Sequence, residues 1–198
     1  MTMPTHAQDV LDFWFGPPTD PDHARQRVQW FRKDEAFDQQ VVARFGTLIE
    51  QALAGGTDGW IASPSQPLPA LARVIVLDQF TRNAFRGSAR AFAGDAMALQ
   101  TARALVAAKL DRGLTGVQRL FVYLPFEHAE DLAHQRTSVQ LFEQLGRDEP
   151  ALAGLLEWAQ RHHDVVARFG RFPHRNAVLG RASTDEEAAF LLTPGSSF

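Results

Sequence analysis

Apolar residues recur along most of the chain at the three- and four-residue spacing that places them on one face of an α-helix. One series runs through residues 37–52 in steps of four, four, three and four, and Gly55-Gly56 predicts the end of that helix. A second series runs through residues 152–166 after Pro150, and Gly170 predicts its end. These two segments are the clearest helices in the sequence.

Weaker patterns predict further helices. Residues 68–80 read as a helix that ends in a loop over residues 81–94, and Asp95 is suited to cap a helix over residues 95–109. Capping boxes, in which two side chains satisfy free amides of a first turn, are predicted for Thr5 with Gln8, Thr115 with Gln118, and Thr184 with Glu187.

The second half of the chain contains one proline that conflicts with a helical pattern. Pro125 lacks an amide donor, so we expect it to interrupt or kink a helix from Gly116, with a polar helix over residues 126–144 after it. Strand signals are nearly absent, because β-branched residues are sparse and no Asn-Gly or Asp-Gly turn occurs. The predicted fold is all-α, a single domain over residues 1–198 with pairwise helical packing.

Composition narrows the function classes. The formal net charge of −3, from 20 basic and 23 acidic residues, lacks the basic surplus of proteins that bind nucleic acid, so no such partner is expected. The absence of cysteine excludes disulfides, thiolate metal ligands and cysteine nucleophiles. No secretory signal is visible and no apolar run reaches about 18 residues. We therefore expect a cytoplasmic protein without a membrane partner.

Three stretches, residues 77–87, 123–131 and 168–176, mix aromatic residues with arginine, histidine, asparagine and carboxylates. In the first, a helix end is followed by guanidinium and amide groups, which suit a phosphate or carboxylate ligand. Its ligand-binding candidates are Asp78, Gln79, Arg82, Asn83 and Arg86. A structural alternative is that Arg82 pairs with Asp78 and that Arg86 holds carbonyl groups at the helix end.

The second stretch offers acid–base chemistry, with His128 and Glu127 as candidate catalytic residues. Adjacent helix positions point about 100° apart, so the better partner for His128 is Asp131, also a candidate, or a residue of another stretch. Such a helix could also ligate a metal, but no second helix carries a matching Glu-x-x-His, so no metal site is predicted. The sequence names no cofactor.

The third stretch surrounds Phe172-Pro173 with donor-rich side chains on a loop that proline stiffens. Arg171, Arg175 and Asn176 are ligand-binding candidates, and His174 is a further catalytic candidate. Alternatively, Arg171 and Arg175 pair with the carboxylates of Glu127, Glu130 and Asp131 and join two helices.

The motif at residues 10–16, Val-Leu-Asp-Phe-Trp-Phe-Gly, and the motifs at residues 77–87, 123–132 and 168–181 together resemble bacterial domain-of-unknown-function family 924. The resemblance implies antiparallel helix pairs stacked as a tetratricopeptide-like right-handed superhelix. It carries no activity that can be transferred. Thr81 stands where the family usually has proline, and Ala129 where serine is common.

The leading functional hypothesis is that the three stretches converge on a cleft that binds a small anionic ligand or an acidic peptide end. One alternative is a hydrolase or lyase that uses a histidine and a carboxylate in the same cleft, with Arg175 stabilising charge. Another is a protein-interaction scaffold in which the motifs only join helices, so that the partner is a protein. The sequence leaves open whether the protein is an enzyme.

Overall fold

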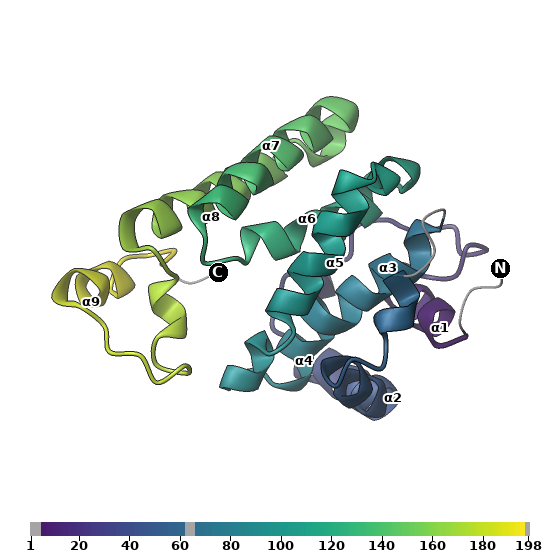
Figure 1. The fold of residues 1–198 in the computed structure, drawn as a ribbon, viewed down its shortest axis with the longest axis horizontal. Helices are drawn as coiled ribbons and strands as arrows, with labels where there is room; N and C mark the ends of the chain where they lie inside the picture. The colour runs from purple at the N-terminus through teal and green to yellow at the C-terminus, as the bar shows by residue number, and fades with distance from the viewer. Residues whose placement is uncertain (1–4, 62–65, 197–198) are drawn as a thin grey trace.

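A computed structural model describes residues 5–61 and 66–196. Within them the chain is helical and contains no strand, which confirms the all-α prediction (Figure 1). The α-helices are α1 (Thr5–Phe15), α2 (Glu35–Leu53), α3 (Pro67–Val74), α4 (Thr81–Ala84), α5 (Asp95–Ala107), α6 (Gly116–Glu127), α7 (Leu132–Asp148), α8 (Leu155–Phe169) and α9 (Asp185–Leu191).

The two clearest predicted helices are present as α2 and α8. Asp34 caps α2 by accepting a hydrogen bond from the Phe37 amide, and the helix ends just before the predicted glycine pair. Gly170 ends α8 in the left-handed conformation, with φ of 70°. Pro150 opens a separate short 3₁₀ helix, Pro150–Leu152, so α8 begins later than the apolar spacing predicts.

The capping boxes at Thr115 and Thr184 are both formed, whereas the Thr5 side chain lies outside the described residues. Pro125 does not interrupt α6, which continues to Glu127. The polar helix begins at Leu132 rather than at residue 126, because Asp131 caps α7 there and the chain leaves the helical conformation before it.

Residues 68–80 do not end in a loop. α3 continues directly into a π-helical segment, Ile75–Phe80, and then into α4. The loop therefore begins four residues later than the sequence predicts. A π-helical turn is wider than an α-helical one and often lies at a functional site. Here it contains Asp78 and Gln79, both buried. Gly94 lies so close to this segment that a Cβ there would overlap the Leu77 carbonyl oxygen.

Most of the apolar core is a single cluster that joins residues from α1 to α8. A smaller cluster at the C-terminal end contains Val165, Val166 and Phe172, packed against Phe169 and Phe190. α7 packs against both α6 and α8, as pairwise packing predicts, and Figure 1 shows α9 on the opposite side of the molecule from α1. The superhelical arrangement stays a prediction.

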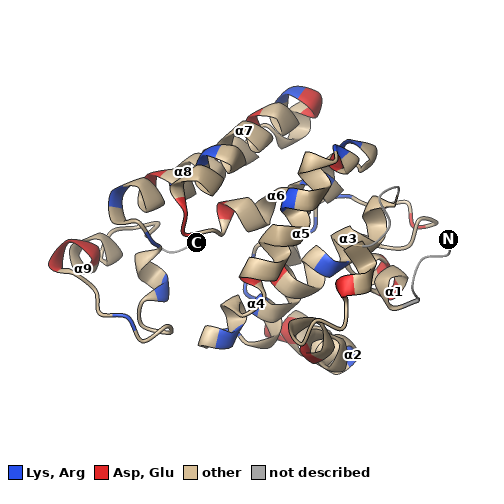
Figure 2. Ribbon diagram, viewed as in Figure 1, with Lys and Arg blue, Asp and Glu red and all other residues tan. Residues whose placement is uncertain are grey.

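Charged side chains are mixed over the elements. Figure 2 shows basic and acidic positions interspersed along the ribbon. In the described part of the chain, no helix combines the length and the apolar character needed to cross a bilayer.

Candidate functional site

One carboxylate links the first and third stretches. Asp95 accepts two hydrogen bonds from Arg82, at 2.8 and 3.2 Å, and one from Arg175, at 3.3 Å. The prediction that Asp95 caps α5 is wrong, because Gly94 is the N-cap residue and no side chain makes the cap. The Asp95 carboxylate instead lies between two guanidinium groups, where the Coulomb attraction is larger than that to a cap amide.

Asp78 is the most enclosed charge of the site. Its carboxylate is 1% exposed and accepts hydrogen bonds from Gln79 Nε2 at 2.6 Å and from His128 Nδ1 at 2.7 Å, and Arg82 Nη1 lies 3.2 Å away. Burial by itself raises the pKa of this carboxyl group, but Arg82 and His128 outweigh burial and hold the pKa well below its usual value. Asp78 is therefore ionised at neutral pH.

His128, at the C-cap of α6, has one ring nitrogen bound and one available. An ionised carboxylate only accepts hydrogen bonds, so Nδ1 carries the proton that is donated to Asp78, and Nε2 holds a lone pair. The bond to Asp78 leaves Nε2 outside that contact, and 15% of the His128 side chain is exposed. Burial and the Arg82 charge lower the pKa of His128, so the imidazole is neutral at pH 7.

Contacts through aromatic rings connect His128 back to Arg175. The ring centroids of His128 and His162 are 6.4 Å apart, and those of His162 and Phe172 are 5.5 Å apart. The Arg175 guanidinium lies 4.5 Å from the Phe172 ring and 4.6 Å from the Phe92 ring. The contacts form a closed circuit, which we call the central cluster: Arg175, Asp95, Arg82, Asp78, His128, His162 and Phe172.

Arg175 is the least satisfied charge of the central cluster. The residue is 6% exposed, its one hydrogen bond within the described chain goes to Asp95, and its Nε is buried without a hydrogen-bond partner. Burial and the neighbouring Arg82 lower the pKa of Arg175 to about 10. A guanidinium has five N–H donors, so this cation retains most of its capacity to bind an acceptor.

Three titratable groups in and beside the central cluster, Glu127, His162 and His174, are neutral at pH 7. Glu127 is 4% exposed, and burial together with the Asp78 charge raises its pKa to about 8. Its Oε1 lies 3.4 Å from Nδ1 of His162, and that nitrogen is also 2.9 Å from the Trp158 carbonyl oxygen. Burial lowers the pKa of His162 to about 3 and that of His174 to about 4.

Other predicted residues of the first two stretches lie outside the central cluster. Asn83 and Arg86 both donate to Asp38 of α2, at distances of 2.7 to 2.9 Å, so Arg86 does not hold carbonyl groups at a helix end. Asp131 is exposed, and its carboxylate accepts from the His134 amide at 2.9 Å as the cap of α7. These three side chains join or begin helices.

In the third stretch, too, some of the predicted residues lie outside the central cluster. Arg171 donates to Glu187 of α9 at 2.6 and 2.7 Å, and Asn176 donates to the same carboxylate at 3.3 Å. Glu130 accepts from Arg181 at 2.5 and 2.8 Å. The interpretation that Arg171 and Arg175 bind the carboxylates of the second stretch is therefore wrong. Arg171 and Asn176 attach α9 to the loop that carries Arg175.

Sequence reasoning missed three members of the central cluster, Asp95, His162 and Phe172, as site residues. His162 carried one local signal, since it is a polar residue on the same face of α8 as Val165 and Val166. No group of three or more His, Asp or Glu side chains in the described chain is placed to hold a metal ion.

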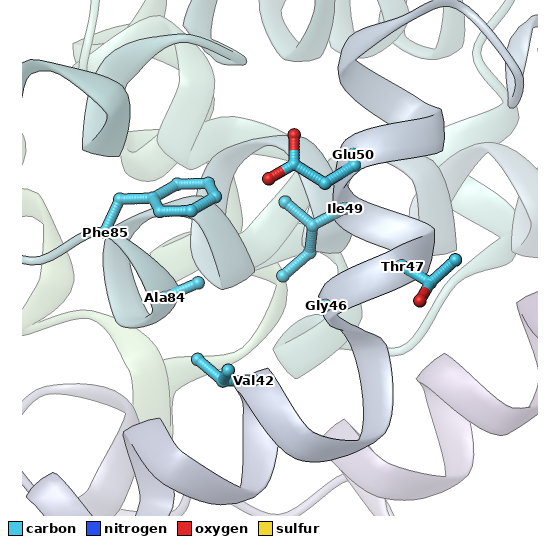
Figure 3. A pocket seen from close by; sticks show the side chains of 7 residues that line it. All are labelled: Val42, Gly46, Thr47, Ile49, Glu50, Ala84 and Phe85. Carbon is cyan, nitrogen blue, oxygen red and sulfur yellow. The ribbon is translucent and has the colours of Figure 1, made fainter.

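Two hollows of the surface lie away from the central cluster. One of about 300 Å³ lies between α2 and the end of α4, where Val42, Ile49 and Phe85 surround it (Figure 3). Another of about 490 Å³ is lined by polar groups that include Arg27 and Arg44.

Comparison with known proteins connects this geometry to a family. A family model described as a bacterial protein of unknown function, DUF924, matches residues 10–195. The chain is similar to a solved structure, the protein of unknown function ATU0120 from Agrobacterium tumefaciens, with 39% identity and a TM-score of 0.80 over 94% of this chain and 96% of that one. No curated protein matches. The chain therefore belongs to the DUF924 family of bacterial proteins.

Proposed function

We propose that the protein binds a small anionic ligand, a carboxylate or a phosphate, at the central cluster. The observation that carries this proposal is the buried Arg175 side chain with an unpartnered Nε. An unmet buried donor costs about 1–3 kcal/mol, and more when the group is charged, so an acceptor that reaches it gains that amount. A ligand oxygen is such an acceptor.

The surroundings of Arg175 favour an anion. Phe92 and Phe172 lie against the guanidinium and keep water away, and an ion pair is stronger where the effective dielectric constant is low. Arg82 adds a second positive charge on the other side of Asp95. The side chains of Arg82, Asp95 and His128 remain 15 to 22% exposed, which supports access from solvent to this part of the cluster.

Thermal unfolding in the presence of acetate, phosphate or a nucleotide tests the proposal. A ligand at a hundred times its Kd stabilises the folded state by about 2.7 kcal/mol, which raises the midpoint by about 5–10 °C for a chain of this size. The shift should disappear in Arg175→Gln and be smaller in Arg175→Lys, which keeps the charge but loses Nε. Arg168→Gln is the matched control, because Arg168 is exposed and pairs with Glu186.

The melting midpoint also distinguishes a small anion from an acidic peptide end or a protein as the partner. A short peptide with a free carboxyl end, compared with its amide, tests for an acidic peptide end as the ligand. If no anion shifts the midpoint and Arg175→Gln only melts earlier, the anion-binding proposal fails and a protein-interaction scaffold becomes the remaining function.

A further inference from the structure

The inference that follows rests on the proposed function. We propose that the anion held at Arg175 is a substrate, and that His128, positioned by Asp78, is the base that removes a proton from it. The substrate class is a small carboxylate with a weakly acidic hydrogen beside the carboxylate group.

The Asp78–His128 contact has the geometry that orients a catalytic imidazole. The 2.7 Å hydrogen bond to an almost fully enclosed carboxylate selects the tautomer with hydrogen on Nδ1. The Asp78 carboxylate is held in turn by Gln79 and Arg82, so neither member of the pair can rotate without losing another contact. The hydrogen bond to Asp78 uses Nδ1, so the lone pair of Nε2 is not engaged by that carboxylate.

The Arg175 guanidinium stabilises the negative charge that the proton transfer leaves on the substrate. When the substrate hydrogen leaves, its bond breaks, the proton goes to Nε2 of His128, and the electron pair stays on the substrate. The new negative charge is stabilised by the N–H groups of Arg175, which are already in place and need no reorganisation. Return of the proton from Nε2 to the product restores the neutral imidazole, so no oxidant or further reactant is needed.

Two series of contacts connect the base to the anion site. One runs from His128 through Asp78, Arg82 and Asp95 to Arg175, and the other runs through the rings of His162 and Phe172. The charges of Arg82, Asp78 and Asp95 also act on the pKa of His128. The lowered pKa of His128 keeps its base form populated at neutral pH, which a proton acceptor requires.

Alkylation with iodoacetate tests this inference without knowledge of the natural substrate. The reagent is a small carboxylate that reacts with a basic imidazole, in which the Nε2–carbon bond forms and iodide leaves. The chain has no cysteine, so no thiol competes for it. We expect His128 to be alkylated about tenfold faster by iodoacetate, which adds a carboxymethyl group, than by neutral iodoacetamide, which adds a carbamoylmethyl group; the difference corresponds to modest anion binding. Peptide mass spectrometry measures both rates.

The protein contains an internal control. His163 also has a carboxylate beside Nδ1, that of Asp164 at 3.0 Å, but it lies on α8 outside the central cluster, so it should show no preference for the anionic reagent. Arg175→Gln should remove the preference at His128 and leave its reaction with iodoacetamide. Asp78→Asn should move the pH midpoint of His128 labelling downward, because the imidazolium loses its carboxylate; an unmoved midpoint would contradict the pairing of Asp78 with His128.

The outcomes distinguish the two proposals. If acetate raises the melting midpoint through Arg175 but His128 reacts no faster than His163, anion binding stands and the role of His128 as a base is rejected. If neither the melting shift nor the labelling preference occurs, both proposals fail. Selective labelling of His128 that depends on Arg175, with acetate protecting it, supports both.

Discussion

Glu127→Gln should make the protein more stable at neutral and alkaline pH. Glu127 is 4% exposed, and its pKa is raised to about 8 by burial and by the Asp78 charge. The folded protein therefore keeps a proton on this carboxyl group that the unfolded chain releases near pH 4.5. Glutamine has nearly the same shape as the protonated side chain and cannot ionise, so it avoids the cost of releasing that proton.

The size of the effect follows from the two pKa values. Between about 4.5 and about 8, the folded state loses stability by about 1.4 kcal/mol per pH unit, for a total of about 5 kcal/mol as an upper estimate. Below pH 6.5 the loss at Glu127 is outweighed, because His162 and His174 both have lowered pKa values and together add more stability as the pH rises toward 6.5 than Glu127 removes. Between pH 6.5 and 8 Glu127 dominates, and the wild type should lose about 2 kcal/mol.

Urea unfolding at half-unit pH steps from 5 to 9 measures the effect. The free energy of unfolding of the wild type should fall between pH 6.5 and 8, and that of Glu127→Gln should stay level. Glu157→Gln serves as the control, since Glu157 is an exposed partner of Arg161 on α8. Parallel curves for the wild type and Glu127→Gln would refute the reasoning, because they would mean that Glu127 does not hold a proton in the folded state.

Three further changes test the packing around the site. Asp95→Asn should lower the free energy of unfolding by about 2 kcal/mol, because the buried Arg175 guanidinium and the partly exposed Arg82 guanidinium then repel each other, and it should tighten anion binding; weaker anion binding in calorimetry would contradict this. Gly94→Ala should cost more than about 2 kcal/mol in urea unfolding, because the new methyl group overlaps Leu77, whereas Gly154→Ala has open space and should be near neutral. Asp38→Ala should lower stability by about 1 kcal/mol and leave acetate binding unchanged in the melting assay, and a loss of binding would place α2 in the ligand site.

The candidate site was predicted in part. Asp78, Arg82, His128 and Arg175 were all singled out from the sequence, and the structure brings them into the central cluster. The sequence did not show which neighbouring polar residues belong elsewhere. Along a helix or a short loop, adjacent side chains point in different directions, so Asn83 meets α2 while Arg82 faces the site.

Interactions between residues close in the chain explain which elements could be predicted. Helix positions, the Thr115 and Thr184 caps and the Gly170 stop depend on residues within one or two turns, so α2, α6, α8 and α9 could be predicted. The π-helical segment was not predicted, and in the folded chain it lies closely against Gly94 at the N-terminus of α5, a contact between segments that local spacing does not show.

Tertiary structure decided the chemistry of the site. The contact between Asp95 and Arg175 joins residues 80 positions apart, and that between Asp78 and His128 joins residues 50 apart, so no local pattern encodes either pair. Burial then sets which groups are charged, because it keeps Glu127 protonated and His162 neutral. The sequence shows the type of each side chain. The residue that it contacts depends on the fold, and its protonation state depends on the dielectric surroundings that the folded chain creates.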